Sequence, residues 1–248
     1  MSISAARDQL DPLETRDPAQ REAALMSALP GLVAAAQASS NAASEILHGV
    51  DAAAVTSRSA LARLPVTRKS DLLARQQAAR AASGDPFGGF SAIGWRGLRT
   101  GRGARRVFQS PGPIYEPEGE AADYWRSARA LHAAGIEAGD LVHVSFSFHL
   151  TPAGSMMESG AHALGCTVFP GGVGNTELQL QAIRELRPQA YAGTPSFLKL
   201  LLDKAAEAGE RLSFTKALVS AEAFPPSLRD AVLEIGRASC RERVLMPV

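Results

Sequence analysis

From about Glu118 onward, the sequence alternates short β-rich runs with segments of helical periodicity. The β-rich runs are 141–146, 166–169, 189–192 and 216–220. The helical segments between them are 155–164, 176–186 and 195–208, and a further helix is expected from Pro225. Strands joined by helices of this length are typical of βαβ units, in which right-handed crossovers place helices on both faces of a parallel sheet. The sequence therefore predicts an α/β fold with a parallel sheet flanked by helices.

Helix boundaries are marked by local signals. Thr176 and Gln179 have the spacing of a capping box, and Thr194 can cap a helix that begins with Pro195. Another helix is expected to end near Gly135. Its apolar face is formed by Tyr124, Trp125, Ala128 and Leu131.

The N-terminal part of the chain predicts helices. Residues 21–47 are rich in Ala and Leu, and apolar side chains recur there at helical spacing. Pro30 and Gly31 interrupt the pattern, so two helices are expected. Residues 81–103 contain many glycines and little periodicity, which predicts an irregular surface segment or a short strand and loop.

Composition excludes several classes of partner. A net charge of +1 creates no field for nucleic acid, and the basic run Arg102, Arg105 and Arg106 is expected to be a solvated loop. There is no uninterrupted apolar stretch of about 20 residues to span a bilayer, and no leader-like start. Cys166 and Cys240 have no metal-ligand spacing and fit a reducing compartment. We expect a cytoplasmic protein with no membrane and no nucleic-acid partner.

Ligands of parallel α/β sheets collect at the carboxyl ends of the strands. The segments to inspect are therefore those that follow residues 146, 169, 192 and 220. The glycine cluster Gly171, Gly172 and Gly174 invites a dinucleotide-binding interpretation and hence a nucleotide-dependent oxidoreductase. Its Gly-Gly-x-Gly spacing does not match the Gly-x-Gly-x-x-Gly fingerprint, which favours a tight turn before a helix.

Five segments carry a resemblance to a known family. They are 64–72 (LPVTRKSDL), 146–165, 167–177 (TVFPGGVGNTE), 194–196 and 220–224 (SAEAF). In order and spacing they resemble the phenylacetate-CoA ligases, which are adenylate-forming enzymes, and the match covers most of the chain.

The resemblance implies an AMP-forming acid–thiol ligase. A carboxylate attacks the α-phosphate of ATP to give an acyl-adenylate, and the thiol of coenzyme A then displaces AMP. The implied cofactors are ATP, Mg²⁺ and coenzyme A, and the implied partner is a small carboxylic acid. Such chemistry needs cationic and backbone N–H groups around the phosphates.

The resemblance places the acyl pocket at 146–154, with Phe146, Phe148, His149 and Gly154 as candidate substrate-binding residues. Two phenylalanines suit a flat aromatic acid. The alternative is that both belong to the hydrophobic core. His149 replaces a glycine of the family loop. The alternative to a role in substrate binding is that its imidazole is exposed and has no role.

The resemblance also assigns candidate nucleotide-binding residues, namely Ser220, Ala221, Glu222 and Ala223 after the last strand and Ser110 and Gly112 in the phosphate loop. The loop 108–117 (FQSPGPIYEP) departs from the family pattern because it has no lysine. Its prolines lack N–H donors and Glu116 would repel phosphate. A rigid turn that binds no phosphate is the alternative. No catalytic residue and no metal ligand is assigned.

The resemblance further implies that the chain is the N-terminal portion of such an enzyme. We expect an N-terminal helical region at 1–80, a truncated α/β ligase core at 81–236 and a foreign, poorly ordered tail at 237–248. The expected function is that of an acyl- or aryl-CoA ligase whose fragment is inactive alone. The alternative is a degenerate homologue that acts as a non-catalytic binding module.

Overall fold

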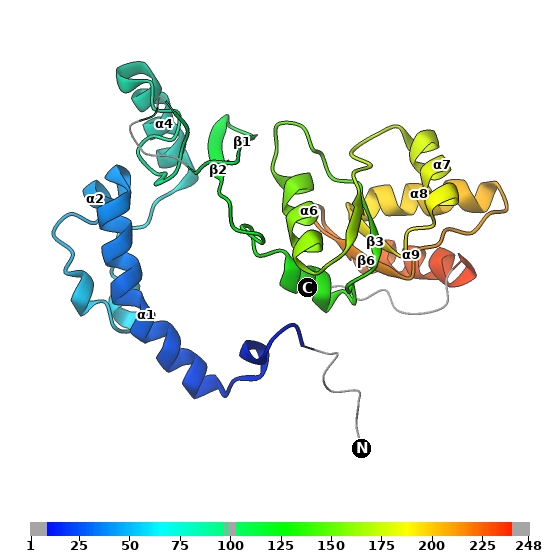
Figure 1. Cartoon of the computed structure of the whole chain (residues 1–248), viewed down its shortest axis with the longest axis horizontal. Helices are drawn as coiled ribbons and strands as arrows, with labels where there is room; N and C mark the ends of the chain where they lie inside the picture. Colours follow the sequence, from blue (N-terminus) through cyan, green and yellow to red (C-terminus); the bar gives the residue numbers. More distant parts are fainter. Residues whose placement is uncertain (1–8, 97, 99–102, 240–248) are drawn as a thin grey trace. The chain divides into compact units, whose positions relative to one another are not determined.

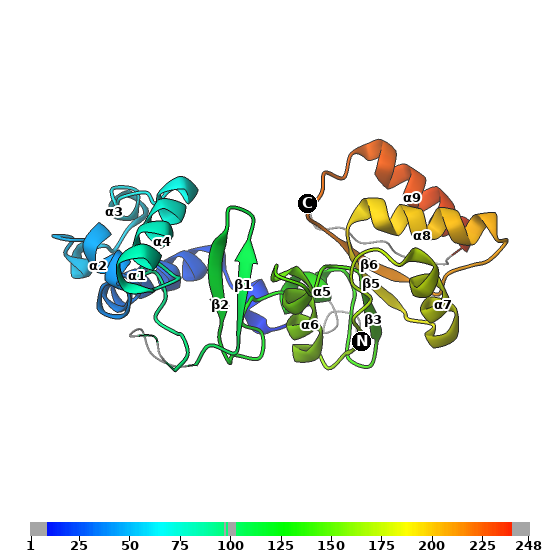
Figure 2. The ribbon, with the colours of Figure 1, turned by 90° about the horizontal axis from the view of Figure 1, so that it is seen from above.

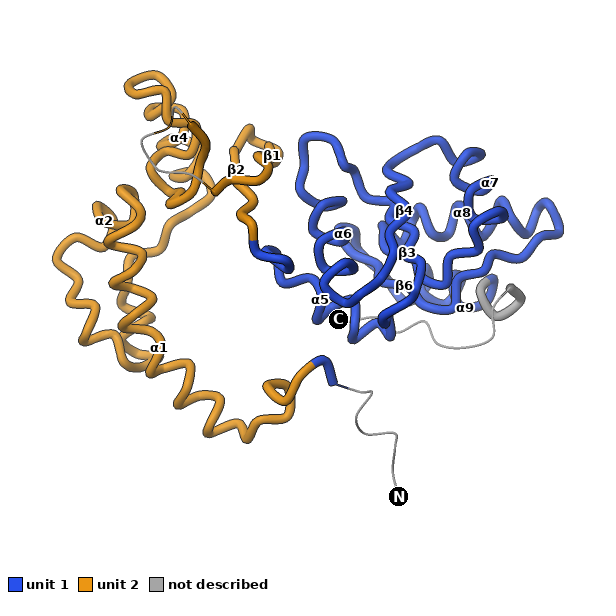
Figure 3. Tube along the Cα trace, viewed as in Figure 1, with its two compact units in different colours: residues 1–10, 121–248 blue, residues 11–120 orange. Residues whose placement is uncertain are grey.

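The computed structural model describes residues 9–96, 98 and 103–239. The chain divides into two compact units (Figures 1 and 3). We call residues 11–120 the helical unit, and residues 1–10 with 121–248 the sheet unit. This division by compactness groups residues 81–120 with the N-terminal helices. The expected domain limits at 80 and 236 stay a prediction.

The helical unit contains four α-helices and two 3₁₀ turns in its described residues. They are η1 (Pro12–Thr15), α1 (Pro18–Ser39), α2 (Asn41–Ile46), η2 (Ala52–Ala54), α3 (Arg58–Leu61) and α4 (Lys69–Ser83). The predicted break at Pro30 and Gly31 is wrong, because α1 continues through Pro30. A proline removes only one helical N–H donor, and the following turn packs Val33 against Val55 and Ala60. The helix ends instead at Ser39. The next residue, Ser40, caps α2, because its Oγ accepts from the Ala43 N–H.

The loop 108–117 forms an antiparallel hairpin. Strand β1 (Arg106–Ser110) pairs with β2 (Ile114–Glu118), and residues 111–113 make the turn. The buried side chain of Gln76 on α4 attaches this hairpin to the helices, since its amide donates to the Tyr115 carbonyl at 2.9 Å and accepts from the Tyr115 N–H at 2.8 Å. Between Ser83 and Arg106 the described residues form neither helix nor strand, which agrees with the first of the two expected alternatives, an irregular segment.

The sheet unit contains a parallel four-stranded sheet in the order β4-β3-β5-β6. Its strands are β3 (Leu141–Val144), β4 (Thr167–Phe169), β5 (Ala190–Gly193) and β6 (Lys216–Val219). Its helices are α5 (Ala128–Ala133), α6 (Ala153–Ala163), α7 (Thr176–Leu186), α8 (Pro195–Glu207) and α9 (Pro226–Ser239). The predicted α/β fold is confirmed.

Helices cover both faces of this sheet, because the side chains of each strand alternate between two hydrophobic clusters. Val142 and Val144 of β3 pack with Leu131 and Ala161, which come from α5 and α6. Tyr191 of β5 belongs to the cluster formed by α7, α8 and α9. Figure 2 shows α5 and α6 on one side of the sheet and the other three helices on the opposite side.

The helix predicted around Tyr124 and Trp125 begins later than expected. Both aromatic residues lie in turns and contact each other edge to face, with ring centroids 5.2 Å apart. The Asp123 carboxylate accepts from the Ser127 N–H at 2.8 Å and also from that of Ala128. An acidic side chain that caps these N–H groups starts the helix at Ala128.

Helix α9 overlaps the segment 237–248 that was expected to be a poorly ordered tail. Helix α9 continues to Ser239, so the first residues of the segment 237–248 are helical. Residues 240–248 lie outside the described residues. No helix among the described residues is long and apolar enough to cross a membrane.

An ion-pair bridge joins non-neighbouring strands at the amino-terminal edge of the sheet. The Nζ of Lys216, at the start of β6, donates to Asp140 at 2.8 Å and to Glu137 at 3.0 Å, just before β3. Asp140 is buried, and its carboxylate also accepts from the Glu137 N–H. Burial by itself lowers the pKa of Lys216, but the hydrogen bonds with Asp140 and Glu137 outweigh it and raise this pKa above its ordinary value. The bridge therefore stabilises the protonated, charged form of Lys216.

We predict that Lys216→Met lowers the free energy of unfolding by about 1.5–3 kcal/mol, the range for hydrogen bonds to charged groups. Lys204→Met is the matched control, because this substitution removes the same charge from a lysine that pairs with Glu207 on the exposed surface. It should change stability by less than about 1 kcal/mol. Urea unfolding followed by circular dichroism measures both, and equal losses would contradict a structural role for the bridge.

Candidate functional site

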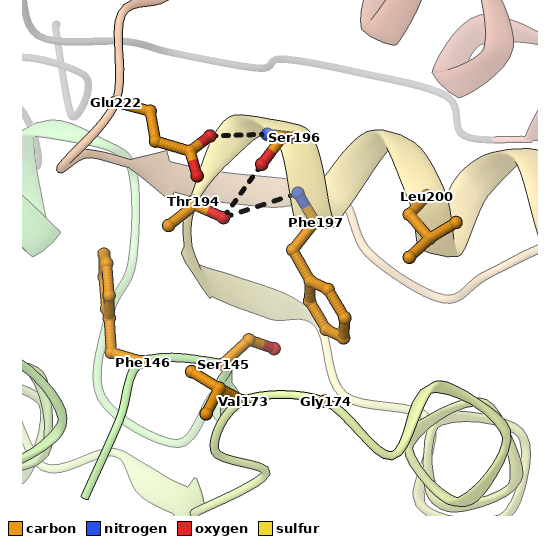
Figure 4. Close-up of a pocket in the computed structure, with 9 residues that line it drawn as sticks. All are labelled: Ser145, Phe146, Val173, Gly174, Thr194, Ser196, Phe197, Leu200 and Glu222. Carbon is orange, nitrogen blue, oxygen red and sulfur yellow. Dashed lines mark hydrogen bonds between the residues drawn. The ribbon is translucent and has the colours of Figure 1, made fainter.

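A pocket of about 430 Å³ opens at the carboxyl-terminal edge of the parallel sheet (Figure 4). Its lining residues are Ser145, Phe146, Val173, Gly174, Thr194, Ser196, Phe197, Leu200 and Glu222. They come from the segments that follow β3, β5 and β6, from the loop before α7 and from the first turns of α8. This is the edge at which parallel sheets bind ligands.

The pocket has an apolar side and a polar side. Phe146 is buried at 6% exposure, whereas Val173 keeps 59% and Leu200 keeps 39% of their surfaces exposed. Together with the Phe197 ring they form the apolar side (Figure 4). Hydroxyl groups and one carboxylate form the polar side. Such a pocket suits a small, largely apolar ligand with a few hydrogen-bonding groups.

The carboxylate of Glu222 lies at the start of α8. It accepts from the Ser196 N–H at 3.3 Å, while the Thr194 Oγ1 accepts from the Phe197 N–H at 3.4 Å. A carboxylate is stabilised at a helix N-terminus, where unpaired N–H groups and the helix dipole meet. Among the residues that the structure describes, no lysine, arginine or histidine lines the pocket. A second negative charge placed beside Glu222 would therefore be repelled.

Gln179 on α7 organises the floor of the pocket. Its Nε2 donates to the carbonyls of Gly172 at 3.1 Å and Gly174 at 2.7 Å. Its Oε1 faces the Ser145 Oγ at 3.0 Å and the His143 Nε2 at 2.7 Å. The predicted capping role of Gln179 is wrong, because this side chain is turned inward and is 3% exposed.

These partners assign the tautomer of His143. Since Gln179 donates to two carbonyls, its oxygen must accept from His143, so Nε2 carries the proton and Nδ1 is the bare nitrogen. His143 is buried between Phe169 and Tyr191, and its Nδ1 has no hydrogen-bond partner in the described structure. Burial lowers the pKa of His143, partly offset by the hydrogen bond with Gln179. His143 is a neutral core residue behind the pocket.

Tyr191 supports the polar side from within the sheet. Its hydroxyl donates to the Thr194 carbonyl at 3.1 Å, and burial raises the pKa of this phenol. The ring folds back along the end of β5, so a Cβ on Gly193 would lie 2.2 Å from the tyrosine oxygen. Only glycine fits beside this ring. Tyr191 thereby helps to set the position of Thr194.

The candidate acyl-pocket residues occupy different surroundings. Phe146 lines the pocket. Phe148 packs against the hydrophobic core instead, and a Cβ on Gly154 would meet its ring at 2.8 Å. His149 is exposed, in a loop closed by bonds between Ser147 and its own backbone. The structure thus brings Phe146 to the pocket and places Phe148, His149 and Gly154 elsewhere.

The candidate nucleotide residues after β6 are all exposed. Glu222 lines the pocket, and its three neighbours in the SAEA segment do not. Ala221 has a φ of 71°, a left-handed conformation that is unfavourable for alanine. Strain of this kind is often found at functional sites.

Ser110 and Gly112 lie in the β1–β2 hairpin of the helical unit. The Ser110 Oγ donates to the Ile114 carbonyl at 3.4 Å, and Gly112 lies in the turn. The pocket belongs wholly to the sheet unit.

Sequence reasoning pointed to the right segments but did not name most lining residues of the pocket. The lining residues that come after Phe146 in the chain follow the strand ends at 169, 192 and 220, as the strand-end rule predicts. Among them, only Glu222 was a candidate site residue, whereas Thr194 was expected as a helix cap.

The described residues offer no ready magnesium site. They contain no group of three or more His, Cys, Asp or Glu side chains that could hold a metal ion. Glu222 is the one carboxylate among the residues that line the pocket, and it already accepts a backbone N–H. By themselves, the residues described do not fit Mg²⁺.

The curated relatives of the chain share one name. This chain is 30% identical over 182 residues to a phenylacetate-coenzyme A ligase of Aromatoleum evansii. The match covers 69% of this chain and 38% of that protein. The chain is also 30% identical over 198 residues to the phenylacetate-coenzyme A ligase of Thermus thermophilus, covering 75% of this chain and 40% of that protein. The chain thus spans about two fifths of the length of these relatives. No family model matches it.

Solved structures agree on the fold. A 2-hydroxyisobutyryl-CoA ligase, crystallised in an open conformation with 2-HIB-AMP and CoA, matches 96% of this chain and 52% of its own with a TM-score of 0.82. Their sequences are 24% identical, which supports a shared fold alone. The sequence similarity to the curated relatives places the chain, over about 70% of its length, in the phenylacetate-CoA ligase family.

Proposed function

We propose that the chain is the acid-binding part of an acyl- or aryl-CoA ligase, which joins a carboxylic acid to coenzyme A at the expense of ATP. The observation that carries this proposal is the pocket at the carboxyl ends of β3, β5 and β6. The relatives named phenylacetate-coenzyme A ligase support it, because their name combines an aryl acid with this cofactor.

The lining of the pocket indicates how an acid would lie. The rings of Phe146 and Phe197 would contact an aromatic body, for which offset or edge contacts are favourable. The acid's carboxylate would point away from Glu222, because like charges repel and none of the described residues that line the pocket is a cation. An aryl acid is thus the proposed substrate class.

ATP and coenzyme A enter the proposal through the relatives. A ligase of similar fold was crystallised with an acyl-AMP and CoA. In this chain we assign the nucleotide end to Ser220–Ala223, where exposed backbone beside Glu222 could meet an adenine edge. When bound, ATP would supply the leaving group for activation of the acid. The role of the chain's own residues is to hold and orient the acid.

A non-catalytic binding module is the second candidate, and the β1–β2 hairpin favours it. Pro111 and Pro113 have no N–H donors, and the Ser110 hydroxyl is used within the hairpin. No lysine lies in this segment to face a phosphate. The chain would then keep an acid pocket without the means to activate the acid.

We predict that the chain binds phenylacetate and that Phe197→Ala weakens this binding about tenfold, since an aromatic contact contributes about 0.5–1.5 kcal/mol beyond its buried area. Leu178→Ala is the control, because Leu178 on α7 is 65% exposed and does not line the pocket. Titration calorimetry measures both variants. An equal affinity in the two would contradict the assignment of the pocket.

We predict that Glu222→Gln strengthens phenylacetate binding severalfold at low salt, because the substitution removes a like charge and keeps an acceptor for the Ser196 N–H. The gain should shrink as ionic strength rises. Glu185→Gln, a surface change on α7, removes the same charge outside the pocket and should leave the affinity unchanged. A gain of the same size in both variants would point to net charge alone.

We predict that the chain releases no pyrophosphate when incubated with ATP, Mg²⁺ and a panel of aryl and fatty acids. Loss of a single preorganised donor costs on the order of 10² to 10³ in rate, and the hairpin lacks several. Calorimetry with AMP separates the two candidates: binding of AMP together with an acid favours the ligase part, and acid binding alone favours the module. Pyrophosphate release that disappears in Phe197→Ala would disprove the prediction.

A further inference from the structure

The pocket wall opposite α8 is formed by a loop with little packing of its own. Val173 supplies an apolar side chain of this wall while 59% of its surface stays exposed. Gly172 and Gly174 on either side have φ values of 71° and 72°, and Asn175 has 49°. A loop of left-handed residues around an exposed valine is not held by burial. Its position must come from hydrogen bonds.

One buried side chain makes two of those bonds. The Nε2 of Gln179 donates to the carbonyls immediately before and after Val173, at 3.1 Å and 2.7 Å. A third bond, from the Gly172 N–H to the Val144 carbonyl at 3.0 Å, joins the loop to the end of β3. The backbone on both sides of Val173 is therefore fixed to groups beneath the pocket.

The other half of the same amide is attached to the sheet. Its Oε1 meets His143 within β3 and the Ser145 hydroxyl, which itself lines the pocket. An amide has two donor hydrogens and two acceptor lone pairs, and in Gln179 all four are used. A fully satisfied, buried polar group of this kind holds its partners in one arrangement.

We propose that Gln179 is the positioning residue of the pocket and that, by fixing Val173 relative to β3, it determines the size of the acid that the pocket accepts. This inference rests on the proposed function of the pocket. Gln179 lies behind the wall and acts on the ligand only through Val173 and Ser145. It controls selectivity between acids and has no part in the chemistry.

The test uses two substitutions of Gln179 in the full chain. Gln179→Met keeps a similar volume and removes all four hydrogen bonds, whereas Gln179→Glu keeps an oxygen for His143 and Ser145 but has no N–H for the glycine carbonyls. Gln181→Met is the matched control, because Gln181 is exposed on the same helix and bonds only to Glu185 among the contacts described. Phenylacetate and 1-naphthylacetate serve as probes of different size.

In both Gln179 variants, the ratio of the two dissociation constants should change by about tenfold in favour of the larger acid, the scale typical of size discrimination in apolar pockets. The methyl NMR signals of Val173 should also shift and broaden without ligand. Gln181→Met should change neither. A residue that only stabilised the fold would leave the ratio unaltered.

Three results would overturn the proposal: an unchanged ratio, Val173 signals like those of Gln181→Met, or failure of both Gln179 variants to fold, which would assign the residue to the sheet. If the unmodified chain binds neither acid, the proposed function fails. The Val173 signals then decide by themselves whether Gln179 positions the wall.

Discussion

The parallel pairing of β3 with both β4 and β5 is the constraint on which the site depends. Because β6 continues the same direction beyond β5, four carboxyl ends meet at one edge of the sheet. The register sets His143 level with Phe169 and Tyr191, so the aromatic layer behind the pocket is a property of the pairing. A shift of one residue would turn these rings to the other face, and Gln179 would lose its partner on β3.

Sequence periodicity predicted the elements of this sheet well and its pocket less well. The limits of α7 were predicted correctly, since its apolar spacing and turn signals agree. Gln179 was wrongly assigned to a capping box, because its spacing from Thr176 fits one. Nothing in that spacing indicates that Gln179 has a buried polar partner, His143, on β3. Phe148 was assigned to the acyl pocket through the family resemblance. Its strand spacing predicts burial but does not distinguish a position in the core from one in a cavity. The predicted helix break at Pro30 was wrong, because the tertiary packing of Val33 outweighs the low helix propensity of proline.

The hairpin of the helical unit contains the segment that the resemblance assigns to the phosphate loop. In β1 and β2, backbone groups that could face an anion pair with each other instead. The Gln76 amide pairs with the edge of β2 as another strand would. The described contacts make this segment a small structural element of the helical unit.

The fold of Tyr191 over the end of β5 has a consequence for how such chains can diverge. Its oxygen occupies the space that any side chain at position 193 would need. A substitution at Gly193 can be accommodated only after the residue at 191 has become smaller, and the hydrogen bond to Thr194 is lost in the same event. Homologous sequences should therefore vary at these two positions together, with the order of changes restricted to one direction.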